Sequence, residues 1–174
     1  DLGQPLPSLQ KPSPISAVQC DKVPVERYGK NFPQVLFDGK RAVPGDYYEG
    51  WAGFCGEELV ELDITLQQPT AVESVVLGVC NAPSDWVLAP ARVEVWLDGQ
   101  WHALSYTAYS EDRNATLSNP NASPDRTRLR YRYSGKHKKV QHLKLRITPQ
   151  PLLPDGHPYQ GEKAWLMIDE VEVQ

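Results

Sequence analysis

The residues that most often carry chemistry are scattered along this chain. Four histidines fall on separate segments, at His102, His137, His142 and His157. In a strand or turn, the spacing between His137 and His142 does not place two ligands on one side, as it would in a helix. We therefore expect both of these histidines to be surface residues. The adjacent carboxylates of Glu57 and Glu58 are typical of solvated charges at the beginning of a strand rather than of an acid–base pair.

Sequence motifs of the common enzyme classes are absent. The chain contains no GxSxG, HExxH, P-loop or GxGxxG motif. The sequence therefore gives no support to an enzyme, and we expect no catalytic residues.

Lysine and arginine are concentrated in residues 126–146, which hold nine of them and no Asp or Glu. Such a segment would suit an anionic polymer, either a nucleic acid or a sulfated or uronic glycan. The alternative is the solvent face of a hairpin whose other face is apolar, made of Leu129, Tyr131, Leu143 and Leu145. Acidic residues on neighbouring strands would then balance the charges, and the candidates are Glu61, Asp63 and Glu94. We favour the solvated hairpin face.

Length and composition describe one globular domain. The chain has 174 residues, of which 40% are hydrophobic and 9% aromatic, enough for a buried core. Its formal net charge of −4 argues against nucleic acid as a partner of the whole chain. No apolar run approaches the length of a membrane span, so we expect none. The chain opens without a charged-then-apolar leader, so we expect any export signal to be removed or to lie outside it.

Proline and cysteine give two further expectations. Sixteen prolines against one methionine favour short strands joined by many turns, because proline is excluded from helix interiors. We expect residues 1–16 to be a proline-rich linker or tail. It would either lead from an upstream lipid anchor or domain, or be a poorly ordered terminus. The three cysteines, Cys20, Cys55 and Cys80, cannot all pair within one chain. Either two form a disulfide in an exported protein, or all three are small buried hydrophobes.

The hydrophobic pattern has the period of two that is typical of strands. Residues 59–66 alternate, residues 72–79 form a more continuous apolar run, and residues 92–97 alternate again. The Asp-Gly pair at 98–99 predicts a two-residue hairpin turn, with residues 101–109 as the return strand.

The C-terminal half continues the same pattern. Further strands are expected at 128–133, 140–147 and 164–173. These bring the named segments to seven, and we expect about eight strands in all. In the last strand, Val171 and Val173 are out of phase with Leu166 and Ile168, which predicts a bulge near residues 169–170. Together the strands and turns predict an all-β antiparallel sandwich.

Several stretches, taken in order, resemble the motifs of one family. They are a-L-x-D-G at 35–41, W-x-G at 51–54, v-x-i-D-L at 59–66, i-x-x-v-x-l at 73–77, P-x-x-V-x-V-x-x-D-G at 90–99 and i-x-E-i-e-V at 168–173. By these motifs residues 17–174 resemble the coagulation factor 5/8 type C, or discoidin, family. The stretches 50–54 and 164–170 are most similar to the accessory C-terminal domains of bacterial β-N-acetylhexosaminidases and to family 32 carbohydrate-binding modules. The resemblance implies a galactose-binding-like jelly-roll β-sandwich.

The resemblance also implies a structural Ca²⁺. In the family the ion is held by the Asp of the D-G loop, by nearby backbone carbonyls and by the Glu of the terminal strand. The matching positions are Asp38, the carbonyls near Arg41, and Glu170, and such a site would tie the first loop to the last strand. The loop lacks the family's usual threonine ligand. Arg41 offers an alternative, in which it neutralises Asp38 directly and replaces the ion.

Sugar sites in this family lie on variable loops at one end of the sandwich. An aromatic ring stacks on the apolar face of the pyranose, and polar side chains bind its hydroxyls. The aromatic residues expected on loops are Tyr47, Tyr48, Trp86 and Tyr159. Asp85 is placed to bind hydroxyls beside Trp86, for which capping of the core is the alternative role. Trp51 is expected in the core.

These implications predict a non-catalytic carbohydrate-binding accessory module. We expect it to be exported, to a bacterial periplasm, cell surface or medium, and to work with a glycoside hydrolase on galactose- or N-acetylhexosamine-containing glycans. One alternative is a structural module that packs on a catalytic domain and binds no sugar. Another is an anion- or protein-binding discoidin domain that uses the basic residues 126–146.

Overall fold

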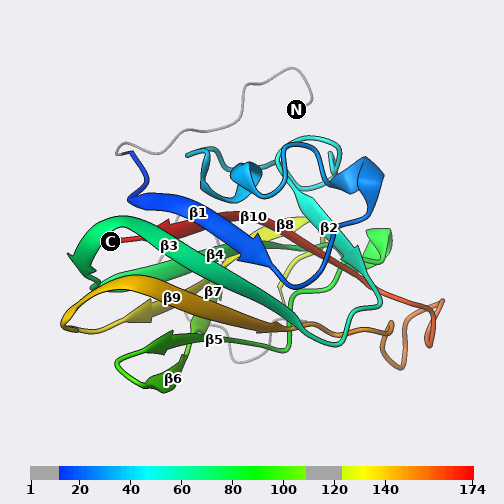
Figure 1. Cartoon of the computed structure of the whole chain (residues 1–174). Helices are drawn as coiled ribbons and strands as arrows, with labels where there is room; N and C mark the ends of the chain where they lie inside the picture. Colours follow the sequence, from blue (N-terminus) through cyan, green and yellow to red (C-terminus); the bar gives the residue numbers. More distant parts are fainter. Residues whose placement is uncertain (1–11, 109–122) are drawn as a thin grey trace.

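The computed structural model describes residues 12–108 and 123–174, which form a sandwich of two five-stranded antiparallel sheets (Figure 1). The strands are β1 (Ile15–Cys20), β2 (Ala52–Cys55), β3 (Val60–Ala71), β4 (Ser74–Asn81), β5 (Arg92–Leu97), β6 (Gln100–Ala103), β7 (Ser105–Ala108), β8 (Thr127–Ser134), β9 (Lys139–Thr148) and β10 (Trp165–Val173). The first sheet has the order β1-β3-β9-β5-β6, and the second has the order β2-β10-β4-β8-β7. The prediction of an all-β antiparallel sandwich is confirmed.

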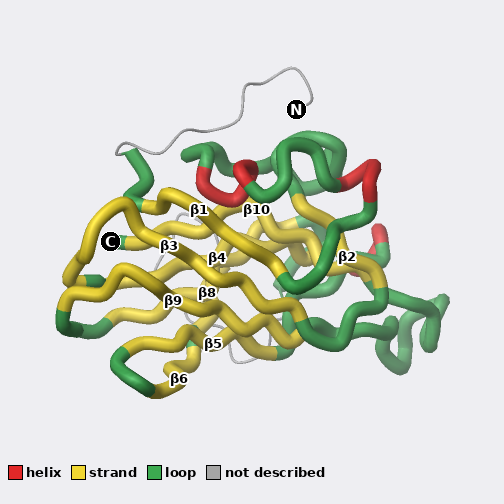
Figure 2. Tube along the Cα trace, viewed as in Figure 1, coloured by secondary structure: helices red, strands yellow, loops and turns green. Residues whose placement is uncertain are grey.

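Helical structure in the described residues is limited to three 3-10 turns: η1 (Glu26–Tyr28), η2 (Gln34–Phe37) and η3 (Pro83–Asp85). None of them is long and apolar enough to cross a membrane. Figure 2 shows long loops at the end of the sandwich opposite the C-terminus, beside η3. The strands therefore form a rigid frame that holds loops at one end.

The core lies between the two sheets, where the strands place their alternating apolar residues. In β3, Val60, Leu62 and Ile64 are buried, while the intervening polar residues are half-buried or exposed. Every residue of β4 is buried, and Cys80 packs against Ala42 and Trp51 of the loops. Trp51 is also buried, and its indole donates to the Val43 carbonyl (3.0 Å). Its predicted place in the core is confirmed.

Two local predictions of strand geometry hold. Asp98 and Gly99 take φ values of 51° and 75° in the turn between β5 and β6, the left-handed backbone that this hairpin turn requires. In β10 the pairing register with β4 shifts between Ile168 and Val171, which is the expected bulge. The bulge returns the valines to the core, and it also leaves both Asp169 and Glu170 fully buried.

The expected return strand 101–109 is interrupted, and its two parts belong to different sheets. β6 pairs with β5 in the first sheet, and β7 pairs with β8 in the second. Leu104 lies between them and is buried. The chain therefore passes from one sheet to the other at this point. This division adds one strand to those expected, and β1 and β2 are the others that the sequence did not predict.

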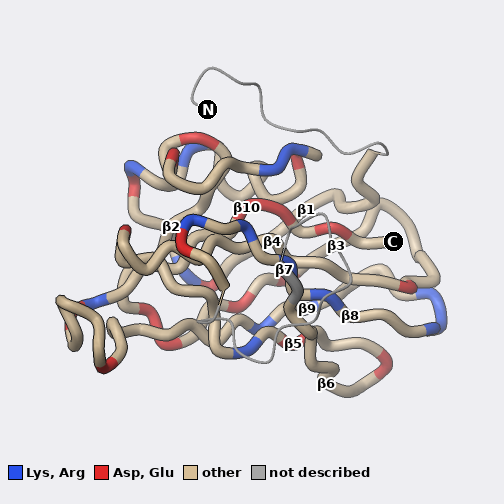
Figure 3. Tube along the Cα trace, turned by 180° about the vertical axis from the view of Figure 1, so that it is seen from behind, with Lys and Arg blue, Asp and Glu red and all other residues tan. Residues whose placement is uncertain are grey.

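The basic segment does not form one hairpin face, so that prediction is wrong. Its strand β8 lies in the second sheet and β9 in the first, so the basic positions of the two strands, blue in Figure 3, belong to different sheets. The apolar side was predicted correctly: Leu129, Tyr131, Leu143 and Leu145 are all buried. Acidic neighbours do balance β9, because Lys144 lies 3.7 Å from Asp63 and Arg146 lies 3.5 Å from Glu61.

Three smaller expectations have mixed outcomes. His142 is exposed as predicted, but the side chain of His137 is only 8% exposed, because it hydrogen-bonds both Tyr133 and Asp98.

β1 begins at the buried Ile15, inside the segment 1–16 expected to be linker, and residues 1–11 lie outside the described residues. All three cysteines are free thiols: Cys80 is buried, whereas Cys20 and Cys55 are half-buried.

Candidate functional site

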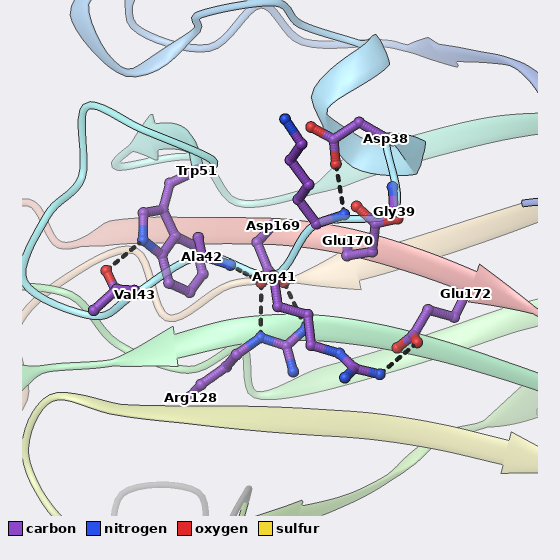
Figure 4. Close-up of polar contacts among 11 residues, drawn as sticks. Asp38, Gly39, Arg41, Ala42, Val43, Trp51, Arg128, Asp169, Glu170 and Glu172 are labelled. Carbon is purple, nitrogen blue, oxygen red and sulfur yellow. Dashed lines mark hydrogen bonds and ion pairs between the residues drawn. The ribbon is translucent and has the colours of Figure 1, made fainter. Parts of the chain in front are cut away.

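An acidic cluster joins the loop after η2 to the last strand, as the resemblance implied. Glu170 of β10 is fully buried, and its Oε2 accepts a hydrogen bond from the Gly39 amide (3.0 Å). Its other oxygen, Oε1, has no hydrogen-bond donor among the described residues. Asp38 lies beside Glu170 (Figure 4), and its Oδ1 accepts a hydrogen bond from the Lys40 amide (2.9 Å). The two carboxyl groups predicted to hold a metal are thus brought together.

The electrostatics of this pair are unfavourable when no cation is bound. Burial, together with the neighbouring Asp38 carboxyl, raises the pKa of Glu170 to about 10 against the opposing effect of the Gly39 amide. A bound cation would remove both the repulsion and the unpartnered oxygen. Oxygen donors alone suit Ca²⁺. In the described residues no three His, Cys, Asp or Glu side chains converge on a metal position, so carbonyl oxygens or water would have to complete the shell.

A buried ion pair next to the acidic cluster fixes the same loop. Arg128 of β8 binds Asp169 through two hydrogen bonds (2.7 and 2.9 Å), and Asp169 also accepts from the Ala42 amide (2.9 Å). The guanidinium of Arg41 pairs with Glu172 (2.9 Å) (Figure 4). Three residues of the loop 38–43, namely Gly39, Arg41 and Ala42, are therefore each bound to a carboxylate of β10.

Gly78 of β4 makes room for the buried ion pair. A Cβ atom at this position would lie 2.0 Å from Asp169 Oδ1 and 2.1 Å from Arg128 Nη2. Only glycine leaves the space that the two side chains occupy.

At the loop end of the sandwich, Asp85 is held by two partners. Tyr47 donates its hydroxyl to Asp85 (2.7 Å), and Arg126 binds both carboxylate oxygens (2.9 and 3.0 Å). The Arg126 guanidinium, with a smaller contribution from the Tyr47 hydroxyl, keeps the pKa of Asp85 below its ordinary value. Burial raises the pKa of Tyr47, and the contact with Asp85 raises it further. The Arg126 side chain is 58% exposed, so it presents N–H donors to solvent.

Trp86 and Tyr159 form an aromatic pair beside this cluster. Their ring centroids are 5.1 Å apart, and Tyr159 is 56% exposed. Trp86 is half-buried and packs against a small apolar cluster of Leu88, Leu153 and Ala164. Its backbone takes φ 65° at the end of η3, a rare conformation for a bulky residue. Trp86 therefore lies between the apolar cluster and Tyr159, and Tyr159 provides the ring that is accessible to a ligand.

Tyr48 belongs to a different aromatic group. It is 60% exposed and stacks on Tyr28 (5.4 Å), which in turn meets Trp165 edge-on (5.1 Å). The Trp165 amide donates a hydrogen bond to the Trp86 carbonyl (2.8 Å), which places the two aromatic groups on neighbouring segments. The structure thus joins Asp85 with Tyr47 and Trp86 with Tyr159, and sets Tyr48 apart.

Sequence reasoning missed Arg126, Tyr28 and His157 as members of this end. Arg126 was counted only within the basic segment, and nothing in the sequence connects it with Asp85. His157 binds the Pro83 carbonyl (2.8 Å), and its backbone carbonyl accepts from the Gln160 amide (3.1 Å), so it ties the loop of Tyr159 to η3. Its position two residues before Tyr159 gave no sign of that contact.

Comparisons with known proteins are limited to the fold. No protein-family model and no curated protein sequence matches the chain. The structure is similar to chitosan-binding module 1 of a chitosanase/glucanase from Paenibacillus sp. IK-5 (10% identity, TM-score 0.45, 91% of this chain and 93% of that one). It is also similar to a pectin-binding carbohydrate-binding module (15% identity, TM-score 0.46, 93% and 91%) and to a chain of reduced XRCC1 bound to the DNA pol beta catalytic domain (14%, 0.48, 93% and 97%). At such identities and scores, no ligand or partner is transferred to this chain.

Proposed function

We propose that this chain is a non-catalytic carbohydrate-binding module that uses the loop end of the sandwich. One observation carries the proposal: the exposed ring of Tyr159 packs on Trp86, the residue that directly follows Asp85 of the Asp85–Arg126 ion pair. An aromatic platform next to fixed polar groups is the arrangement that binds a sugar ring, with its apolar face on the ring and its hydroxyls on the polar groups. The discoidin-like motifs of the sequence support the same class of ligand.

The polar groups have distinct roles in this proposal. Asp85 already accepts from Tyr47 and Arg126, so it positions the guanidinium more than it binds sugar. Arg126 is the residue that donates to hydroxyls or to a ring oxygen. Tyr159 provides the aromatic ring on which the sugar stacks, and Trp86 packs behind it. The exposed Tyr48 would add a second contact for a longer glycan.

Calcium has a structural role in this proposal. Asp38 and Glu170 would supply carboxylate oxygens, and the ion would neutralise their repulsion and fix the loop 38–43 on β10. The association with a glycoside hydrolase, the export of the chain and a preference for galactose- or N-acetylhexosamine-containing glycans are parts of the same proposal, and they rest on the resemblance alone.

A glycan-array screen with calcium tests the proposal. The array should carry chains ending in galactose, N-acetylglucosamine and uronate. We expect a specific signal that Tyr159→Ala removes and that Leu152→Ala, at another exposed position of the same loop, leaves intact. A blank array from folded protein would favour instead a structural module that packs on a catalytic domain.

A further inference from the structure

Five side chains lie in one row across the outer face of the first sheet. The register pairs that build the row are Gln19–Asp63, Asp63–Lys144, Lys144–Trp96 and Trp96–Trp101. Directly opposed residues share a face of a sheet, so all five stand on the same side. Because neighbouring strands lie about 4.8 Å apart, the row from β1 to β6 is about 19 Å long. It runs across the strands of the sheet that lies nearer the viewer in Figure 1.

The aromatic half of the row lies in a shallow hollow of about 430 Å³, lined by Asp63, Trp96, Trp101, His142, Leu143 and Lys144. Trp96 is 40% exposed, an unusual position for so large an aromatic side chain. Its ring lies 5.2 Å from that of Trp101, and the guanidinium of Arg146 sits 3.9 Å above Trp101. This cation–π contact holds Trp101 in place. The result is a fixed aromatic surface with hydrogen-bonding groups beside it.

The charges around the row are balanced. Three ion pairs lie on this face: Asp63–Lys144 (3.7 Å), Glu61–Arg146 (3.5 Å) and Glu94–Arg92 (3.5 Å). A polyanion or a polycation would meet as many like charges as opposite ones. A neutral ligand that both donates and accepts hydrogen bonds would find partners at every pair.

We propose that this row binds an unbranched neutral oligosaccharide, laid lengthwise across the strands, as a second site separate from the loop end. A pyranose ring has an apolar face for Trp96 and hydroxyls for Asp63 and Lys144, and the length of the row accommodates several units. The proposal goes beyond the loop-end function and does not require that site to bind.

The test measures how affinity depends on chain length. The probes are oligosaccharides of one to six residues of glucose, galactose or N-acetylglucosamine, titrated into the whole chain by calorimetry. In at least one series we expect affinity to rise about tenfold or more from monomer to hexamer, and Trp96→Ala to abolish the rise. Asp63→Asn, which preserves the size of the side chain, should weaken the rise without affecting the fold. If no series shows a rise, or if both variants retain it, the inference is wrong.

Tyr159→Ala separates this inference from the proposed function. Loss of monosaccharide binding in that variant, with the length dependence retained, supports both sites. If the unchanged protein binds monosaccharides but its affinity does not rise with oligosaccharide length, the proposed function at the loop end is supported and the second site is contradicted. Affinity that falls steeply with salt would show a charged ligand and contradict the neutral one. A dimer that Trp96→Ala converts to monomer would show that the face contacts a second copy instead.

Discussion

Replacing Glu170 by glutamine tests the electrostatics of the acidic cluster. The pKa of Glu170 is raised from 4.5 to about 10 in the folded chain. Since the folded pKa is the higher one, the stability linked to this proton is fully present below pH 4.5 and is lost as the pH rises toward 10. Each pH unit above 4.5 lowers the free energy of unfolding by about 1.4 kcal/mol. In EDTA at pH 7, the unchanged protein is therefore about 3 kcal/mol less stable than it would be with this proton bound.

Glutamine keeps the shape of the side chain and does not titrate. In EDTA at pH 7 we therefore expect Glu170→Gln to be more stable than the unchanged protein by about 3 kcal/mol, or roughly 6–12 °C in Tm. The difference should shrink toward zero near pH 4.5. Calcium at a thousand times Kd should reverse the order, because an ion bound only to the folded unchanged protein then stabilises it by about 4 kcal/mol.

Urea unfolding at pH 5, 6, 7 and 8, with and without calcium, measures these differences. Glu58→Gln is the matched control, because Glu58 is exposed and should show neither effect. If the unchanged protein and Glu170→Gln have the same pH slope in EDTA, the carboxyl group is not perturbed and the reasoning fails. If calcium stabilises neither, the cluster holds no calcium.

Three further predictions concern the ion pairs and the aromatic platform. Gly78→Ala should destabilise the chain by about 3–5 kcal/mol in urea unfolding, since its Cβ would displace the buried Arg128 ion pair; a cost below about 1 kcal/mol would contradict this geometry. Trp86→Ala should cost about 2–3 kcal/mol because the ring packs on the apolar cluster below it, whereas Tyr159→Ala should change stability by less than about 1 kcal/mol; equal losses in thermal unfolding would refute the division of roles. Asp85→Asn should be less stable than the unchanged protein above pH 4, and the difference should narrow as the pH falls below 3.8 through the lowered folded pKa; a difference that does not narrow at all in acid would show that the ion pair is not its cause.

The strands and turns could be predicted because they depend on local patterns. Alternation identified β5, the Asp98–Gly99 pair identified its hairpin turn, and a change of phase identified the bulge in β10. Alternation says which side of a strand is buried, but it does not say which sheet the strand joins. For this reason the placement of β8 and β9 in different sheets was not predicted.

The candidate site was predictable only in part, for the same reason. Asp38 and Glu170 were found through motifs, but the burial of Glu170 depends on how the bulge and the loop pack. Arg126 pairs with Asp85 across 41 positions of the chain, and the pairing is accompanied by left-handed backbone at Trp86 and Arg126. No periodic pattern in the sequence predicts such a contact. The alternation in β5 leaves Trp96 on the outer side of its strand, yet the row that it completes follows from a register across five strands.

Sugar binding at the loop end is the central claim, and a calorimetric titration tests it most directly. Glycans ending in galactose and in N-acetylglucosamine would be titrated into the unchanged protein and into Tyr159→Ala, with calcium present. We expect saturable binding of at least one glycan by the unchanged protein and a loss of about tenfold or more in affinity in the folded variant. Binding that Tyr159→Ala leaves unchanged, or no binding by the unchanged protein, would contradict the claim.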